Sequence, residues 1–369
     1  MRKRYKIFGI IVLAAVICSI GLIYYISENG LPGITFNVGY DVYVDNNYAY
    51  ISNNDGIAIY DVTNPKNTKK VGNLDIEDGA FGIIVKDGIA YCAGDSSGFV
   101  IADVSDPKNP VKLGQYSDGG SALKVAVSGD FAYVTDTVDG LEIIDISNLS
   151  NPTEVGQFNG GGWPCIYVSE DIAYYGDDSG LKAINVSIPN SPQLISSRSN
   201  VGVLDIYVQE DLLFIASHQY GVRIYNISDP RTLVHLGQFT DVGESYGVSG
   251  NATHLYVADL QEGAQLLDIS DPSTPQKIKE YTDTMPHDIF HDGEYIYLAD
   301  QDKALIILDS ELKGIYSDSA IPGLRLIPVS DIAILGFGLI LAIVVLTSFL
   351  RRRKWKNRKL QNMGSIYEK

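Results

Sequence analysis

Short apolar segments separated by turn residues recur along most of the chain. Residues 121–158 contain one clear copy, in which SALKVAVS, FAYVTD, LEIIDIS and TEVGQF are separated by GD, TVDG and NLSNP. Runs rich in β-branched and aromatic residues, bounded by Gly, Asp, Asn and Pro, are typical of strands joined by turns. The pattern therefore predicts four short strands in each copy.

Three landmarks recur at one interval and show how many copies there are. An Asp or Asn ends an apolar run every 40 to 42 residues, at Asp61, Asp103, Asp145, Asn185, Asn226, Asp268 and Asp309. An aromatic residue keeps the same spacing, at Tyr50, Tyr91, Tyr133, Tyr174, Phe214, Tyr256 and Tyr297. A Gly lies five residues before six of the seven acids, and Ala304 replaces it in the last copy. Seven copies of one unit indicate a structural repeat, because a catalytic motif is rarely repeated.

The acid opens a recurring turn sequence, of which LLDISDPSTP at 266–275 is one example. Side chains of Asp, Asn and Ser accept hydrogen bonds from nearby backbone N–H groups and hold tight turns. Pro fixes φ and has no N–H, so it ends the preceding strand. The sequence thus predicts a turn between the third and fourth strands of each copy, with no chemical role.

Four strands in about 41 residues is the size of one propeller blade. The first strand of each copy is apolar on both faces, as expected for sheets packed around an axis, and no helical period accompanies it. A solenoid of 41-residue coils is the alternative geometry. We predict an all-β, seven-bladed β-propeller over residues 38–318. Either residues 313–317 or residues 33–36 would supply the fourth strand of the last blade.

The repeated phrase, as in GLEIIDISNLSNP from Gly140, resembles the LVIVD repeat of bacterial and archaeal secreted and surface proteins. The resemblance covers about residues 38–318, and the last repeat departs from it, with DSELKG in place of the Ser-Asp-Pro turn. It implies a seven-bladed β-propeller at the cell surface and says little about activity.

Two uncharged apolar segments, residues 7–26 and 332–350, lie near the ends of the chain. Each is long enough to cross a bilayer as a helix. Basic tails at 1–6 and 351–369 flank them, and such flanks stay in the cytoplasm. We predict a transmembrane signal-anchor (or a cleaved signal peptide), linkers at 27–37 and 319–331, and a second transmembrane helix. The propeller would then be extracytoplasmic, with both termini cytoplasmic and the basic tail near anionic headgroups.

The net charge of −17 is unevenly distributed. Twelve of the 28 Lys and Arg residues but only one of the 45 Asp and Glu residues lie in the tails, so the intervening part carries about −28. Such a surface repels nucleic acid and suits cationic partners or metal ions.

The residues at the start of the first strands differ from copy to copy, where they read YD, FG, LK, PC, LD, YG and HD. In a propeller they would lie around the mouth of the central channel, with Trp163 of the loop NGGGWP close by. The candidate binding residues are Tyr40, Asp41, Lys124, Trp163, Asp205, Tyr246, His287 and Asp288. An aromatic residue and three acids could hold a sugar, a peptide tip or a metal ion there.

The turns between the second and third strands would lie on the same face and are rich in acids. They contain Asp55, Asp95, Asp136, Asp139, Asp177, Asp178, Asp259, Glu262, Asp300 and Asp302. One interpretation is solvated turns, and the other is an acidic rim for a cationic partner or Ca²⁺, which prefers clustered carboxylates. No calcium-loop motif is present, so no cofactor is assigned.

Catalytic motifs are scarce. His287 and His291 are four residues apart in a predicted strand, so they do not form a helical metal pair. Four glycosylation sequons occur, at Asn148, Asn185, Asn226 and Asn251. The leading hypothesis is a binding or scaffolding module that contacts a surface protein or glycan through its acidic face. A surface hydrolase or lyase with acids at the channel mouth, and a structural envelope component, are the alternatives.

Overall fold

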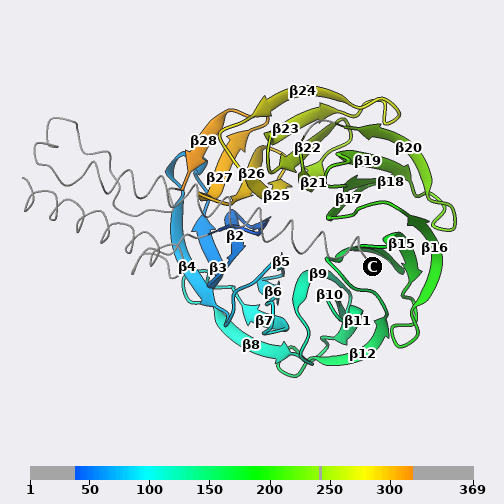
Figure 1. The fold of residues 1–369 in the computed structure, drawn as a ribbon. Helices are drawn as coiled ribbons and strands as arrows, with labels where there is room; N and C mark the ends of the chain where they lie inside the picture. The colour runs from blue at the N-terminus through cyan, green and yellow to red at the C-terminus, as the bar shows by residue number, and fades with distance from the viewer. Residues whose placement is uncertain (1–37, 241–242, 319–369) are drawn as a thin grey trace, which may run out of the picture. The chain divides into compact units, whose positions relative to one another are not determined.

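Seven four-stranded sheets are arranged around a common centre in the computed structural model, which describes residues 38–240 and 243–318 (Figure 1). Within each sheet the strands are antiparallel neighbours in chain order, with the first innermost and the fourth outermost. Each sheet is one repeat, so the predicted seven-bladed β-propeller is confirmed. We number the blades 1 to 7 in chain order.

The strands follow the predicted repeats closely. In blades 1 to 4 they are β1 (Asp41–Asp45), β2 (Tyr48–Asn53), β3 (Gly56–Asp61), β4 (Lys69–Asp75), β5 (Gly82–Lys86), β6 (Ile89–Ala93), β7 (Phe99–Asp103), β8 (Val111–Tyr116), β9 (Ala122–Ser128), β10 (Phe131–Asp136), β11 (Gly140–Asp145), β12 (Thr153–Phe158), β13 (Cys165–Ser169), β14 (Ile172–Asp177), β15 (Gly180–Asn185) and β16 (Gln193–Ser199). In blades 5 to 7 they are β17 (Asp205–Gln209), β18 (Leu212–Ala216), β19 (Val222–Asn226), β20 (Val234–Phe239), β21 (Ser245–Gly250), β22 (His254–Asp259), β23 (Gly263–Asp268), β24 (Gln276–Tyr281), β25 (Pro286–His291), β26 (Tyr295–Asp300), β27 (Ala304–Asp309) and β28 (Gly314–Ser317). One short 3-10 helix, η1 (Pro65–Asn67), lies in the turn after β3.

The recurring Asp or Asn ends the third strand of every blade and holds the turn that follows. Its Oδ1 accepts the backbone N–H of the residue two positions on, at 2.8 to 3.1 Å in all seven blades. The predicted turn is therefore present in each repeat, including the last one, where DSELKG replaces Ser-Asp-Pro. The recurring Gly starts or immediately precedes the third strand with a positive φ, which Gly adopts without strain. Ala304 takes the same conformation with φ of 54°.

The same turn also packs against the neighbouring blade. A Cβ added to Gly156 on β12 would lie 2.0 Å from the carbonyl oxygen of Pro189, in the turn of the next blade. Gly72, Gly114 and Gly237 make equivalent close approaches to the turns of their next blades. Only Gly allows the outer strand and the turn to approach this closely, so the turn residues serve blade packing as well as chain reversal.

The hydrophobic core consists of layers between adjacent blades. One cluster joins Ile57 and Ile59 of blade 1 to Ile83 and Val100 of blade 2, and each of the other six clusters likewise combines residues of two neighbouring blades. Each sheet is covered on both faces by the neighbouring blades. Its inner strands are therefore apolar on both faces, as predicted.

The last blade is completed from its own repeat. Of the two predicted closing strands, the one near residue 313 is present as β28, and residues 33–36 lie outside the described part of the chain. Blades 7 and 1 are then joined without a shared strand. Gly39 N–H donates to the Asp300 carbonyl at 3.0 Å, and the Tyr60 hydroxyl donates to Asp318 Oδ2 at 2.7 Å.

The predicted membrane-spanning segments, 7–26 and 332–350, lie outside the described residues, as do the tails and linkers beyond 38 and 318. Among residues 38–240 and 243–318, no helix is long and apolar enough to span a bilayer.

Candidate binding site on the mouth face

The seven innermost strands start at one end of the blades, which we call the mouth face. Adjacent inner strands contact each other around the ring, from β1 to β5 and onwards to β25, which contacts β1. One repeat position near their start therefore recurs seven times around the mouth face. It is occupied by Asp41, Gly82, Lys124, Cys165, Asp205, Gly247 and Asp288.

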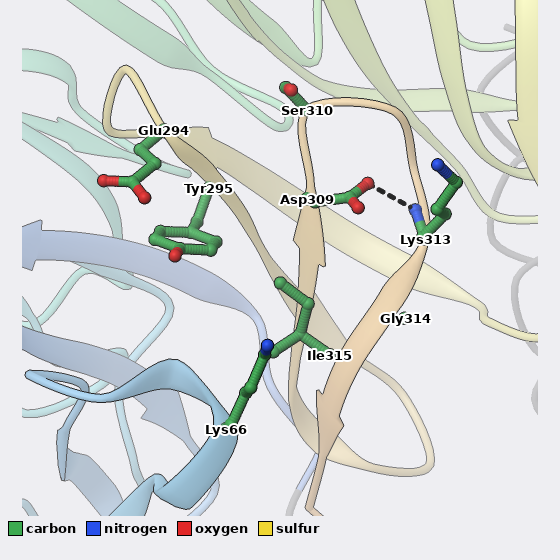
Figure 2. Close-up of a pocket in the computed structure, with 8 residues that line it drawn as sticks. All are labelled: Lys66, Glu294, Tyr295, Asp309, Ser310, Lys313, Gly314 and Ile315. Atoms are coloured by element: carbon green, nitrogen blue, oxygen red, sulfur yellow. Dashed lines mark hydrogen bonds between the residues drawn. The ribbon is translucent and has the colours of Figure 1, made fainter.

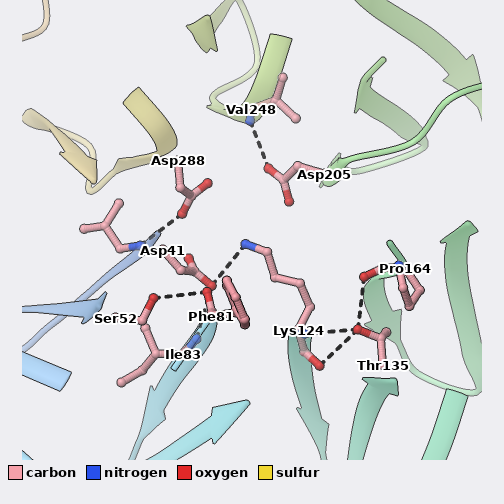
Figure 3. A network of polar contacts seen from close by, with 11 residues as sticks. Asp41, Ser52, Phe81, Ile83, Lys124, Thr135, Pro164, Asp205, Val248 and Asp288 are labelled. Atoms are coloured by element: carbon pink, nitrogen blue, oxygen red, sulfur yellow. Dashed lines mark hydrogen bonds and ion pairs between the residues drawn. The ribbon is translucent and has the colours of Figure 1, made fainter. Parts of the chain in front are cut away.

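Each of the three Asp residues at this position binds the next blade. Asp41 Oδ2 accepts the N–H of Ile83 in blade 2 at 3.1 Å, and Asp288 Oδ2 accepts the N–H of Val42 in blade 1 at 3.1 Å (Figure 3). Asp205 Oδ2 accepts the N–H of Val248 in blade 6 at 2.9 Å. These carboxylates thus link neighbouring inner strands, and the Asp288 bond closes the ring.

Lys124 reaches from blade 3 toward all three carboxylates. Its Nζ lies 3.1 Å from Asp41 Oδ2 (Figure 3). Burial alone would lower the pKa of Lys124, but the negative charges of Asp41, Asp288 and Asp205 raise it, so the ammonium stays protonated. We call Asp41, Lys124, Asp205 and Asp288 the central cluster.

The environment separates the three acids. Burial alone would raise the pKa of Asp41, but Lys124 and hydrogen bonds from Asp288 and Ile83 N–H hold it below its ordinary value. Burial raises the pKa of Asp288 well above its ordinary value, and Lys124 offsets this only in part. Burial also raises the pKa of Asp205. A proton is therefore favoured on Asp288, where it can be donated to ionised Asp41.

Aromatic side chains also lie on the mouth face. Six rings, each from a different blade, form a continuous series in the order Trp163, Phe81, Tyr40, His287, Tyr246 and His218. Successive ring centroids are 4.9 to 6.3 Å apart, within the range of favourable aromatic contacts. We call these residues the aromatic series. Its Trp163 end is 58% exposed, so it offers an apolar surface to solvent.

Hydrogen bonds fix two central members of this series. Tyr40 donates its hydroxyl proton to Asn54 Oδ1 at 2.6 Å. His287 Nδ1 lies 3.0 Å from the Gly39 carbonyl oxygen, which can only accept, so Nδ1 carries the proton. Burial lowers the pKa of His287, which favours the neutral ring.

The structure brings the predicted mouth residues together. Tyr40, Trp163, Tyr246 and His287 belong to the aromatic series, and the predicted Lys124 and acids form the central cluster. Phe81 and His218 were not among the predicted site residues. Phe81 occupies the same position in its repeat as Tyr40, so an alignment of the repeats is enough to identify it. His218 pairs with Glu244, with 3.6 Å between Nε2 and Oε2.

Four of the predicted rim acids are buried inside their turns. Asp136, Asp177, Asp259 and Asp300 end the second strands, and each is at most 6% exposed. In each, Oδ1 accepts two backbone N–H groups of the turn that follows. These acids stabilise turns and present little charge to a partner. Asp178 is exposed, while Asp95 and Asp139 are half-buried.

The four sequon Asn residues also hold turns. Each accepts at least one backbone N–H through Oδ1, at 2.9 to 3.2 Å. His287 and His291 both lie on β25, as expected, and so are not paired as helical metal ligands.

A separate pocket lies at the opposite end of blade 7, beside blade 1 (Figure 2). Its volume is about 560 Å³, and it is lined by Lys66, Glu294, Tyr295, Asp309, Ser310, Lys313, Gly314 and Ile315. Asp309 there accepts the N–H of Lys313 at 2.8 Å, and the Lys313 ammonium pairs with Glu311 at 2.6 Å. No sequence pattern indicated this pocket. Its polar groups stabilise the turn that follows β27.

Seven blades of one repeated unit define a β-propeller repeat protein. The family model of the LVIVD repeat matches residues 39–75, 79–118, 119–160, 244–283 and 286–325, which is more than half of the chain. The chain therefore belongs to the LVIVD-repeat family, as its sequence pattern indicated. No curated protein matches it.

Solved structures with a similar fold share little sequence with this chain. The β-propeller domain of Myceliophteria thermophila Cps50 (Swd1) has a TM-score of 0.58 and 12% identity, covering 76% of this chain and 95% of that one. The computationally designed Ika8 protein has a TM-score of 0.54 and 9% identity, covering 75% and 98%. The extracellular domain of the putative one component system BT4673 from B. thetaiotaomicron has a TM-score of 0.55 and 17% identity, covering 74% of this chain and 38% of that one. These likenesses show the fold alone.

Proposed function

We propose that this protein is a recognition module that binds a partner protein through the aromatic series on the mouth face. The observation that carries the proposal is the series itself, in which six blades each contribute one ring to a continuous surface. Inner strands need only apolar residues to pack. A partly exposed series of Trp, Phe, Tyr and His side chains is therefore better explained by binding of a ligand. Aromatic residues are enriched where proteins bind their partners.

The charge of the site favours a cationic segment of the partner. The central cluster contains three carboxyl groups and one ammonium, and the chain as a whole carries −17. Aromatic faces attract Lys and Arg side chains through cation–π contacts, with a contribution of about 0.5–2 kcal/mol each. A basic loop tip would thus find ring faces around it on a protein of net negative charge, whereas nucleic acid would be repelled.

The location completes the proposal. The apolar segments 7–26 and 332–350 would anchor the chain in a membrane, with the basic tails in the cytoplasm and the propeller outside. A propeller held there would meet proteins or glycans of the cell surface.

Trp163 provides a direct test, because the chain has only two Trp residues and Trp355→Phe leaves it as the sole reporter. The full chain in a mild detergent would be titrated with Lys- and Arg-rich peptides, Glu-rich peptides of equal length, and neutral oligosaccharides. We expect a saturable change in Trp163 fluorescence with basic peptides alone.

Tyr40→Ala should weaken this binding at least tenfold, because it interrupts the middle of the aromatic series. Tyr220→Ala is the matched control, since Tyr220 is 45% exposed and contacts Arg223 outside the series. Equal affinity in the Tyr40 and Tyr220 variants would contradict the proposal. A response to oligosaccharides alone would replace the protein partner with a glycan.

A surface hydrolase or lyase is the second candidate. It is favoured by the opposite pKa shifts of Asp41 and Asp288, since acid–base pairs often have their pKa values pushed apart. Against it, each of these side chains is engaged with the next blade and only 7% exposed. An enzyme of this kind should lose turnover in Asp288→Asn while it retains substrate binding, and unchanged turnover would exclude this pair as the catalytic acids.

A further inference from the structure

Three carboxylates of blades 2 and 3 converge outside the central cluster. Asp118 lies in the loop between β8 and β9, Asp139 in the turn between β10 and β11, and Glu142 on β11. One oxygen from each lies within 4.8 Å of the others. Since Ca²⁺ binds oxygens at about 2.3–2.6 Å, two oxygens on one ion are at most about 5 Å apart. The three oxygens are therefore close enough to share an ion.

Glu142 shows that this cluster differs from ordinary surface acids. Its residue is only 4% exposed, and its Oε1 is buried with no hydrogen-bond partner among the described residues. Buried carboxylate oxygens are rarely left without a partner, because desolvation is costly. The acids nearby are already engaged: Asp136 accepts two turn N–H groups, and Glu154 accepts the Tyr116 hydroxyl at 2.7 Å.

Blade 4 has a positively charged residue at the repeat position of Glu142. Glu142 is the third residue of its third strand, and Lys182 occupies that position in blade 4. Lys182 Nζ lies 2.6 Å from Asp177, which is the blade 4 counterpart of Asp136. Among the ion pairs of residues 38–240 and 243–318, none involves Asp118, Asp139 or Glu142. Blade 4 thus contains its own cation, whereas blade 3 has a buried acid in its place.

We propose that Asp118, Asp139 and Glu142 bind a Ca²⁺ ion that joins the loop between blades 2 and 3 to the rim of blade 3. The three carboxylates supply the oxygen ligands that Ca²⁺ prefers, and water completes the shell on the side of exposed Asp118. The ion supplies positive charge near this position, as the Lys182 ammonium does in blade 4. Mg²⁺ binds more weakly, because it requires a compact octahedral shell.

The test uses the full chain, stripped with EDTA and titrated with Ca²⁺ by calorimetry, with thermal unfolding measured beside it. We expect one site per chain, with Kd of about 10⁻⁵–10⁻³ M, and a rise of several degrees in Tm at saturating Ca²⁺. Mg²⁺ at the same concentration should give a smaller rise. No binding and no change in Tm at 10 mM Ca²⁺, taken as roughly ten times the weakest Kd expected, would overturn the proposal.

Two substitutions at one position separate metal binding from folding. Glu142→Gln keeps the side-chain shape and should weaken Ca²⁺ binding at least tenfold. Glu142→Lys reproduces blade 4, so it should remove the Ca²⁺ response while the Ca²⁺-free Tm stays at or above that of the unmodified protein. Asp178→Asn, in the equivalent turn of blade 4, is the control and should bind Ca²⁺ normally.

If Glu142→Gln does not fold, Asp139→Asn tests the same site from the half-buried turn and should also weaken binding at least tenfold. Wild-type affinity in a folded Glu142 or Asp139 variant would overturn the assignment. This inference does not depend on the proposed partner, because it is read from Ca²⁺ binding and Tm alone.

Discussion

The two ends of the blades differ in how far the seven repeats agree. At the end opposite the mouth face, an Asp or Asn closes the third strand seven times and makes the same hydrogen bond each time. On the mouth face, one repeat position near the start of the inner strand is occupied by Asp, Gly, Lys, Cys, Asp, Gly and Asp. The strand order is the same in all seven blades, so the two ends differ mainly in what their side chains contact.

The side chain of the recurring Asp or Asn bonds within its own turn, and therefore any blade can use the same residue there. The mouth residues bond across blades or across the centre, where neighbours differ from blade to blade. Asp41, for example, contacts blade 2 through Ile83 and blade 3 through Lys124. The position that repeats in every blade thus makes local hydrogen bonds. The contacts of the position that differs between blades depend on the closed ring of seven blades.

Replacement of Lys124 on the mouth face should cause the largest loss of stability. Lys124→Met keeps a long side chain but leaves three carboxyl groups without the ammonium between them. Breaking a largely buried ion pair costs about 3 kcal/mol, so we expect a loss of this size in the free energy of unfolding, measured by urea denaturation.

Lys112→Met is the control, because Lys112 is an exposed residue on the outer strand β8 and should change stability by less than about 0.5 kcal/mol. Similar small losses in both variants would show that the central cluster contributes little to the ring.

Changes at the opposite end should have smaller effects that depend only on local hydrogen bonding. Asn226→Ala removes the acceptor of the Ser228 N–H at 3.1 Å and of its hydroxyl at 2.6 Å. We expect a loss of about 1 kcal/mol, typical of one or two net hydrogen bonds. Asn226→Asp restores the acceptor, as other blades do naturally, and should stay within about 0.5 kcal/mol of the original protein. An equal loss in both variants would contradict the local role.

The repeat spacing was sufficient to predict the fold. Strand content, turn chemistry and blade number all follow from the seven-fold recurrence of one pattern, and the start of each inner strand could be placed at one end by topology alone. This is why Asp41, Lys124, Asp205 and Asp288 are predicted to lie around the channel mouth, although the sequence leaves open whether the three acids converge. Their distances could not be predicted, because they depend on how far each side chain extends across the closed ring.

The acidic rim illustrates what spacing cannot determine. Asp136 and Asp178 are both acids of rim turns, yet Asp136 is buried and Asp178 is exposed. The difference arises because Asp136 ends a strand and folds back onto the N–H groups of Val138 and Asp139. Glu142 is a similar case, since a polar residue in an apolar strand is visible in the sequence but its burial against Asp118 is not.

The smallest effect should come from Asp288, and its size depends on pH. The pKa of Asp288 is raised in the folded protein above its value in the unfolded chain. The folded state therefore holds a proton that the unfolded state releases above about pH 4, so this group lowers stability as pH rises through that window. Asn in its place imitates the protonated carboxyl, since it can accept the Val42 N–H and donate to Asp41.

We expect Asp288→Asn to match the original protein near pH 4 and to become progressively more stable relative to it as pH rises toward 8. Urea denaturation at a series of pH values measures this difference. Asp41→Asn should be less stable throughout, because the pKa of Asp41 is lowered and its charge is the partner of Lys124. If the two variants had the same pH dependence, Asp41 and Asp288 would be electrostatically equivalent. Their different contacts on the mouth face would then have no effect on their pKa values.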